Sequence, residues 1–311
     1  MSKNANPVLC ILGPTGSGKT AVSIELAEHL PQVEIISADS LAVYRYLDIG
    51  TAKPPKEVRA RILHHLVDFL DPRERWSAHD FKKEALRLLY EMSLRNSFPI
   101  IVGGTAFYLD ALLRSTPNLG APGDERLRHI LGKMKNEQLF ALLAHIDPHR
   151  AMQIGRNDRK RLIRALEIFL ATGRIPSEKR EHGKKPQRFR YLLVGIAWEK
   201  SELEKRIRER VEDMFCMGIV EEVVHLFRLG YRLPLPALEN FTYRPIVALL
   251  EGKCSLPEAK EAVIRGTMLF VKRQMNWFRK MPIVWFSPEK GGLGKVTREI
   301  LHFVRTQIDG G

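Results

Sequence analysis

Short apolar runs alternate with amphipathic segments along the first third of the chain. The runs at 8–12, 33–37 and 98–102 have the length of buried strands, while 21–30 and 78–94 carry apolar residues at helical spacing. Strands that alternate with helices are typical of a parallel sheet, because each crossover between parallel strands needs a long connection. The pattern therefore predicts an α/β fold with a parallel sheet flanked by helices.

The pattern changes between Gly120 and Pro186, where no strand is predicted. Three helices are predicted there, at 124–134, 137–145 and 159–172. An apolar run at 191–198 then restores the strand pattern. It is followed by predicted helices at 201–217, 219–229, 256–265 and 266–279 and a short strand at 283–286. We therefore expect a core domain made of 1–119 and 189–311, with an all-helical insertion domain at 120–188.

A glycine-rich loop directly follows the first predicted strand. It reads Gly13-Pro14-Thr15-Gly16-Ser17-Gly18-Lys19-Thr20, a full match to G-x-x-x-x-G-K-[ST]. Its glycines let backbone N–H groups turn inward, Lys19 adds a positive charge, and the next helix presents its N-terminus to the same anion. The loop predicts a P-loop-type core with a polyphosphate or diphosphate site, and a chance glycine-rich turn is the weaker interpretation.

The ends of the other predicted strands indicate what happens to that phosphate. Motor and switch NTPases carry an acidic residue at the end of a second strand, where it holds the magnesium shell. Here the strand at 98–102 ends in Gly103-Gly104-Thr105, and the run at 191–198 has no acid. ATP hydrolysis coupled to motion is therefore the weaker interpretation of the loop.

Two polar residues follow strands at the expected carboxyl edge of the sheet. Asp39 comes after the second strand and should face the same crevice as Lys19, where it could accept a proton. The alternative is a helix-capping or turn aspartate. Thr105 follows the third strand, and its hydroxyl could orient a reacting group or cap the next helix.

The charge of the chain points to a polyanionic partner. The 311 residues include 50 Lys and Arg against 36 Asp and Glu, a formal net charge of +14. Nucleic acid is favoured over a membrane, because the chain shows no basic amphipathic helix, no lipidation signal and no apolar run of ~20 residues. We expect a cytoplasmic protein without a disulfide or zinc site, and we expect His64 and His65 to be surface or helix-packing residues.

Six ordered motifs give the chain a resemblance to the tRNA dimethylallyltransferases, also called tRNA isopentenyltransferases. They are the loop at 13–20, Ile-Ser-Ala-Asp-Ser at 36–40 with Val-Tyr-Arg and Asp-Ile-Gly-Thr-Ala-Lys-Pro up to 54, Val-Gly-Gly-Thr at 102–105 with Tyr108, the stretch from Asn-Asp to Arg-Ala-Leu-Glu at 157–167, and Lys-Arg-Gln-Met-Asn-Trp-Phe-Arg at 272–279. The family moves a dimethylallyl group from its diphosphate to N6 of the adenine next to the tRNA anticodon, with Mg²⁺ bound.

The resemblance implies a role for each residue of the site. Asp39 would accept the N6 proton, Thr105 would bond near that amine, and Lys19 and Arg210 would absorb the charge of the leaving diphosphate. The diphosphate would lie in the amides of residues 15–20, and Thr20 would help to position Mg²⁺.

The resemblance also implies the partners, which are the tRNA anticodon stem-loop and dimethylallyl diphosphate. The expected tRNA contacts are Asp39, Ser40, Leu41, Ala42, Thr105, Arg128, Lys160, Arg161, Leu162, Ile163, Arg164, Tyr243, Arg244, Lys272, Arg273, Gln274, Trp277 and Arg279. A solvated face is the alternative for the basic helix at 159–172, and core packing is the alternative for Trp277 and Phe278. We expect no membrane partner and a monomer.

Two departures from the family pattern affect recognition of the base. Ala42 stands where many members have Gln. Thr242 stands where the family usually has Gly, and Pro245 is compatible only with the first turn of a helix running to Leu250.

Two other functions remain open from the sequence. One is a prenyltransferase acting on free adenine nucleotides, against which the +14 charge speaks. The other is a P-loop small-molecule kinase, which has no use for the Asp-Ile-Gly-Thr-Ala-Lys-Pro motif.

Overall fold

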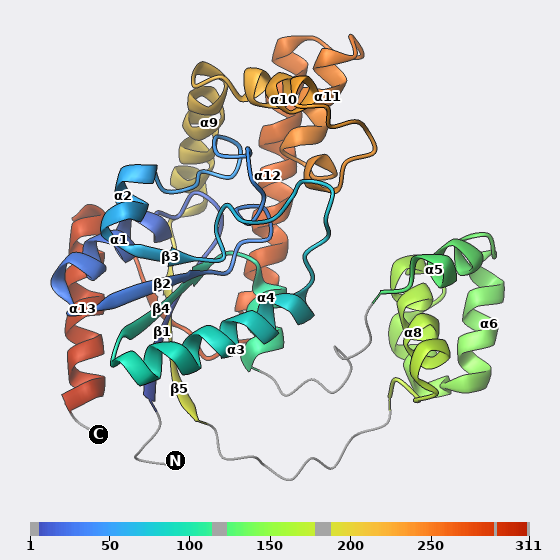
Figure 1. Ribbon diagram of the computed structural model, residues 1–311, viewed down its shortest axis with the longest axis horizontal. Coiled ribbons are helices and arrows are strands. Elements are labelled where there is room, and N and C mark those ends of the chain that lie inside the picture. Colours follow the sequence, from blue (N-terminus) through green and yellow to red (C-terminus); the bar gives the residue numbers. More distant parts are fainter. Residues whose placement is uncertain (1–5, 114–122, 178–187, 289–290, 310–311) are drawn as a thin grey trace. The chain divides into compact units, whose positions relative to one another are not determined.

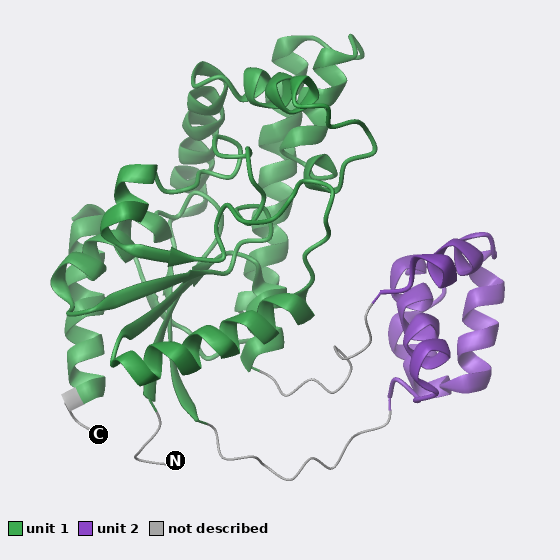
Figure 2. Ribbon diagram, viewed as in Figure 1, with its two compact units in different colours: residues 1–113, 186–311 green, residues 114–185 purple. Residues whose placement is uncertain are grey.

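The chain folds as two compact units. The computed structural model describes residues 6–113, 123–177, 188–288 and 291–309 (Figure 1). One unit comprises Met1–Leu113 and Pro186–Gly311, and the other is the continuous segment Arg114–Lys185 (Figure 2). The expected boundary at 119/120 falls outside the described residues.

A six-stranded sheet forms the centre of the first unit, with the strand order β3-β2-β4-β1-β5-β6 and parallel pairing throughout the described strands. The strands are β1 (Asn6–Leu12), β2 (Val33–Ser37), β3 (Leu63–His65), β4 (Phe98–Gly103), β5 (Phe189–Ile196) and β6 (Val284–Phe286). Val8 to Leu12 are fully buried, because β1 has a strand on each side and helices above and below. The predicted parallel α/β class is confirmed.

The described helices of this unit are α1 (Lys19–His29), α2 (Lys56–Arg61), α3 (Ala78–Arg95), α4 (Ala106–Leu113), α9 (Lys200–Cys216), α10 (Ile219–Arg228), α11 (Tyr243–Leu250), α12 (Leu256–Phe278) and α13 (Gly292–Asp309), with a 3₁₀ turn at Pro236–Leu238. Helices flank the sheet, whereas α10 and α11 lie away from its strands and pack against α9 and α12 (Figure 1). Leu9 and Ile11 of β1 pack against α1 and α13, while α3 contacts β4 and α4. A second apolar core joins α9–α12 to the segment around Val43 and Leu47.

The structure differs from the predicted elements at α12, at β3 and at three further helices. The helices predicted at 256–265 and 266–279 are one helix, α12, which continues through Gly266, where a Cβ would lie 2.8 Å from the side chain of Phe241. Strand β3 was not predicted, since Leu63-His64-His65 is short and mostly polar. Helices α2, α7 and α13 were also missed.

The second unit contains four described helices around its own core. They are α5 (Glu125–Gly132), α6 (Asn136–Ile146), α7 (Pro148–Ile154) and α8 (Arg159–Thr172). Aspartates cap three of them, since the side chains of Asp124, Asp147 and Asp158 accept N–H groups from the first turns of α5, α7 and α8. Leu131, Leu139, Leu143, Ala151, Leu162, Ala165 and Leu166 form the buried core.

Candidate active site

The glycine-rich loop turns directly from β1 into α1. Gly18 has φ 90°, a left-handed conformation that favours glycine, and Leu293 lies 2.6 Å from where its Cβ would be. Because α1 begins at Lys19, the N–H groups of Gly18, Lys19 and Thr20 have no carbonyl one turn back to bond with. These groups and the positive end of the helix dipole are suited to an anion.

Three side chains from later in the chain hold the loop from outside. The side-chain oxygen of Gln274 accepts the N–H of Thr15 at 3.0 Å, while Trp198 Nε1 donates to the Ser17 carbonyl at 3.0 Å and Arg206 Nε donates to the Gly16 carbonyl at 3.1 Å. The Ser17 N–H is also used, in a bond to the Pro14 carbonyl. The amides of Thr15 and Ser17 therefore have protein partners, and the amides of Gly18 to Thr20 remain available to a diphosphate.

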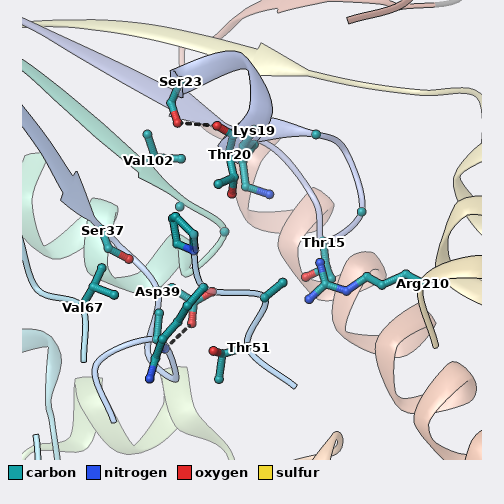
Figure 3. A pocket seen from close by; sticks show the side chains of 18 of the residues that line it. Thr15, Lys19, Thr20, Ser23, Ser37, Asp39, Thr51, Val67, Val102 and Arg210 are labelled. Atoms are coloured by element: carbon teal, nitrogen blue, oxygen red, sulfur yellow. Dashed lines mark hydrogen bonds between the residues drawn. The ribbon is translucent and has the colours of Figure 1, made fainter. Parts of the chain in front are cut away.

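A first cavity of about 410 Å³ opens beside this loop (Figure 3). Its walls come from the loop, the carboxyl ends of β2 and β4, the segment 51–54 and helix α9. Figure 3 shows Arg210 extending from α9 toward Asp39 and Thr51. The cavity therefore joins the phosphate loop to the aspartate, as expected for strands whose carboxyl ends share one edge.

The charges in this cavity influence one another. The pKa of Lys19 is lowered to about 8, mainly by burial; the charge of Asp39 opposes this shift and the charge of Arg210 adds to it. Burial also lowers the pKa of Arg210, again opposed by Asp39. The structure thus brings together Lys19, Asp39 and Arg210, two cations and one carboxylate.

Asp39 is held by its own backbone turn. Its Oδ1 accepts the N–H groups of Leu41 at 2.8 Å and Ala42 at 3.2 Å, whereas Oδ2 has no hydrogen-bond partner among the described residues. Thr105 Oγ1 accepts the N–H of Ser40 at 3.2 Å, which ties the end of β4 to the residue after Asp39. Close approach here requires Gly103, whose Cβ would lie 2.3 Å from the Ala38 carbonyl.

A second cavity of about 470 Å³ adjoins the first. Four residues line both: Thr15, Asp39, Thr51 and Arg210. The second cavity is otherwise lined by Ser40, Thr105, residues 239–242 and 244, and the side of α12 that carries Phe270 and Arg273. Asp39 therefore stands at the boundary between a site suited to phosphate and a larger site that includes apolar and aromatic groups.

Thr20 is the only residue that we expected to hold a metal, and it lines the first cavity. No group of three His, Cys, Asp or Glu side chains within the described ranges could hold a metal ion by itself. Mg²⁺ commonly keeps waters and takes substrate phosphate oxygens with few protein ligands. A hydroxyl beside a phosphate loop fits that donor set.

Three residues that line the first cavity were given no role in the site from the sequence. Thr51 and Lys53 belong to the Asp-Ile-Gly-Thr-Ala-Lys-Pro motif, which was the available signal. Lys53 is 1% exposed and bonds to Asp48 at 2.8 Å and Asp68 at 2.9 Å. His64 is half-buried and lines the first cavity from β3, and its Nε2 is buried without a hydrogen-bond partner among the described residues.

The expected tRNA contacts of the first unit fall into two groups. Lys272, Arg273, Arg279 and Arg244 are exposed, and Ser40, Leu41, Arg244 and Arg273 line the second cavity. Ala42 is buried beside Asp39, and Tyr243 (0% exposed) and Gln274 (2% exposed) are buried with their polar atoms bonded within the protein. Tyr243 and Gln274 therefore lie inside the protein, whereas Ala42 still lines the first cavity.

The structure also shows how the aromatic pair Trp277 and Phe278 packs and how the chain enters α11 at Thr242 and Pro245. Trp277 is half-buried and meets Phe107 edge to face at 6.1 Å, while Phe278 is fully buried. Thr242 has φ −82°, so the freedom of glycine is not needed there. Pro245 lies in the first turn of α11, as predicted.

The second unit carries the remaining expected contacts. Lys160 and Arg161 are exposed on α8, Ile163 is half-buried and Leu162 is in the core. Arg128 and Arg164 both pair with Glu167, whose side chain is fully buried. Leu162 therefore supports the basic face and cannot belong to it.

Comparisons with known proteins show to which family the chain belongs. The IPP transferase family model matches residues 42–281. The chain is 41% identical over 278 residues to tRNA dimethylallyltransferase 2 of Geotalea daltonii, a match that covers 88% of this chain and 85% of the relative. It is 38% identical over 292 residues to the tRNA dimethylallyltransferase of Thermotoga maritima, covering 93% and 94% of the two chains.

Solved structures give the same result. The crystal structure of the full-length tRNA isopentenylpyrophosphate transferase of Bacillus halodurans aligns with a TM-score of 0.72 at 34% identity, covering 99% of this chain and 98% of that one. A eukaryotic dimethylallyltransferase captured acting on tRNA aligns with a TM-score of 0.85 at 26% identity, covering 98% and 80%. With these matches over most of its length, the chain belongs to the IPP transferase family, the family of the tRNA dimethylallyltransferases.

Proposed function

We propose that the protein transfers a dimethylallyl group from dimethylallyl diphosphate to N6 of the adenine next to the anticodon of tRNA, releasing diphosphate. One observation carries this proposal: Asp39 lies on the wall shared by two cavities, of which one contains the phosphate loop and the other has room and apolar surface for a base. A substrate diphosphate on one side and an amine on the other would meet at this carboxylate.

The reaction needs one bond to form and one to break. The N6 nitrogen attacks the allylic carbon as the carbon–oxygen bond to the diphosphate breaks, and the proton of the amine passes to the free Oδ2 of Asp39. Lys19 and Arg210 stabilise the negative charge that grows on the leaving oxygen. The Leu41 and Ala42 amides fix the Asp39 side chain before the base arrives.

Thr105 has a part in presenting the amine. Its hydroxyl accepts the Ser40 N–H, so its own hydrogen is free to point toward an acceptor in the second cavity. We assign Thr105 to orienting the target base.

Mg²⁺ would be held by the Thr20 hydroxyl together with oxygens of the diphosphate. When bound, the ion would add positive charge to the leaving group. The protein residues that act on the diphosphate directly are Lys19, Arg210 and the free amides of Gly18 to Thr20.

Binding of tRNA is assigned to the exposed basic residues. In the first unit these are Arg244, Lys272, Arg273 and Arg279, and in the second they are Arg128, Lys160 and Arg161, together with the half-buried Arg164. These basic residues belong to the positive surplus of the chain, a net charge of +14, which favours a polyanionic partner. A substrate of nucleotide size would need few of them.

One experiment tests the function against its alternatives. The purified protein is incubated with Mg²⁺ and labelled dimethylallyl diphosphate, with either unmodified bulk tRNA or AMP as the acceptor. We expect the label in tRNA, on the adenine next to the anticodon after nuclease digestion. Label on AMP in the absence of RNA would instead indicate a nucleotide prenyltransferase, and transfer of labelled γ-phosphate from ATP would indicate a kinase.

A further inference from the structure

One carboxylate on α10 holds the loop that separates the two cavities. Glu222 Oε2 accepts the N–H groups of Asp48 at 2.6 Å and Ile49 at 2.7 Å, and Oε1 accepts that of Gly50 at 3.3 Å. Three consecutive amides of the loop therefore point at the same side chain. The residue that follows them, Thr51, lines both cavities.

A buried tyrosine completes this anchor. The hydroxyl of Tyr243 donates to Glu222 Oε1 at 2.7 Å, and its ring lies against Gly50, whose Cβ would be 2.4 Å from the ring. Glycine is therefore required at this position of the loop. Tyr243 is 0% exposed, so the hydroxyl has no water as an alternative partner.

The hydroxyl oxygen of Thr51 is free to accept a hydrogen bond at the boundary between the two cavities. Its hydroxyl donates to the Leu47 carbonyl at 2.6 Å, which orients its oxygen lone pairs away from the backbone. Figure 3 shows Thr51 beside Asp39 in the first cavity. The next residues, Ala52 and Lys53, continue the wall of that cavity.

We propose that Glu222 is a positioning residue for the prenyl transfer: it fixes the loop 48–51 through three hydrogen bonds to the loop amides and is itself held by a fourth from Tyr243, so that Thr51 stands beside Asp39 where the two substrates meet. This inference rests on the proposed function. Glu222 itself lines neither cavity. Its effect must pass through the loop backbone and through Tyr243.

The arrangement requires an ionised carboxylate. A carboxylate can accept from four donors at once, whereas the amide of Gln has one accepting oxygen and would turn an N–H₂ group toward either the loop amides or Tyr243. Hydrogen bonds to a charged group are also stronger than neutral ones. The Glu222→Gln variant should therefore keep the size of the side chain and lose the anchor.

The test compares Glu222→Gln with Glu221→Gln, which removes an exposed carboxylate from the preceding position of the same helix. Hydrogen exchange of the amides of 48–50 and steady-state kinetics with tRNA and dimethylallyl diphosphate are measured on the full chain. We expect faster exchange at 48–50 and a loss of about 10²-fold in kcat/KM for Glu222→Gln, the size expected for a misplaced group of about 1 Å. Glu221→Gln should match the wild type in both.

A second variant covers the case in which Glu222→Gln does not fold. Tyr243→Phe removes only one of the four bonds and should give a smaller change in the same direction in both measurements. Faster exchange at 48–50 with unchanged kcat/KM, or unchanged exchange in a folded variant, would overturn the inference. The exchange measurement needs no substrate, so it tests the anchor even if the wild type proves inactive on tRNA, a result that would count against the proposed function alone.

Discussion

The guanidinium of Arg128 forms an ion pair with the carboxylate of Glu167, with Nε 2.9 Å from Oε1, and its Nη2 donates a hydrogen bond to Oε2 at 3.3 Å. Glu167 is 0% exposed, whereas Arg128 is 43% exposed and can still offer N–H groups to a partner. Arg164 pairs with the same carboxylate at 2.7 Å, and the Asp124 amide donates to it at 2.6 Å. Glu167 therefore joins α5 to α8 and places two arginines next to each other.

Replacing Glu167 by Gln should destabilise the second unit, most strongly near neutral pH. Burial alone would raise the pKa of Glu167, but hydrogen bonds from Arg164, Asp124 and Arg128 bring it below the ordinary 4.5. A lowered pKa in the folded state means that the stabilisation is complete above about pH 4.5 and is lost as the pH falls through the folded-state pKa. Thermal unfolding of the full chain across this range should show the acid-dependent loss in the wild type and a weaker pH dependence in the variant. Equal pH profiles would contradict this role.

Asp39→Asn should lower turnover by about 10²–10⁴-fold, the usual contribution of a general base. The variant keeps the shape of the side chain and loses its ability to take the proton. Binding of dimethylallyl diphosphate should stay close to normal, because the loop and Lys19 are unchanged; equilibrium binding and single-turnover rates measure the two effects separately. A variant with normal turnover would exclude Asp39 as the base.

The affinity for dimethylallyl diphosphate should fall as the pH rises through about 8. Burial lowers the pKa of Lys19 to about 8, so above this pH the free protein increasingly holds a neutral amine at the phosphate loop. Direct binding measurements between about pH 7 and pH 9 test this, with Lys19→Arg as the comparison because arginine stays charged. A pH dependence that persists unchanged in Lys19→Arg would assign the titration to another group.

Lys160→Ala combined with Arg161→Ala should weaken tRNA binding and reduce the salt dependence. Both side chains are exposed on α8, so their loss removes phosphate contacts without touching the core. The slope of log K against log salt should become shallower by about 1 for each lost contact. A charge-matched pair on α3, Lys83→Ala with Arg87→Ala, serves as the control, and an equal effect from that pair would mean that only net charge matters.

Gln274→Leu should destabilise the first unit by about 1–3 kcal/mol for each backbone group left without a partner. The amide of Gln274 accepts from the Thr15 N–H at 3.0 Å and donates to the Gly104 carbonyl at 2.8 Å, so it fastens the phosphate loop to the end of β4. Thermal unfolding and KM for dimethylallyl diphosphate should both change. Asn276→Ala, exposed on the same helix, should change neither.

Local pattern was sufficient to predict the strands and helices that bury a continuous face. Strands β1, β2 and β4 were found because both faces of each are covered, which leaves an unbroken apolar run in the sequence. Strand β3 lies at the edge of the sheet and has no such run. Helix α12 continues through Gly266, although glycine has a low helix propensity.

The site residues that follow strands could be predicted from the sequence, whereas those on loops could not. Asp39 and Thr105 could be placed near Lys19 because the carboxyl ends of parallel strands share one edge. The positions of Thr51 and His64 could not, because they depend on the path of the loops around them. Glu222 fixes that path from 174 residues away in the sequence, at Asp48. Likewise, burial of Tyr243 and Gln274 reflects tertiary packing, which their sequence motifs do not reveal.

The placement of the helical unit has a consequence for how the chain is made. Strand β1 pairs with β4, which precedes Arg114–Lys185, and with β5, which follows it. The helical unit is formed by one continuous segment of the chain. Domains tend to fold as units when they leave the ribosome. During synthesis the helical unit can therefore be folded before β5 has been made. Until then, the edge of β1 that pairs with β5 stays exposed.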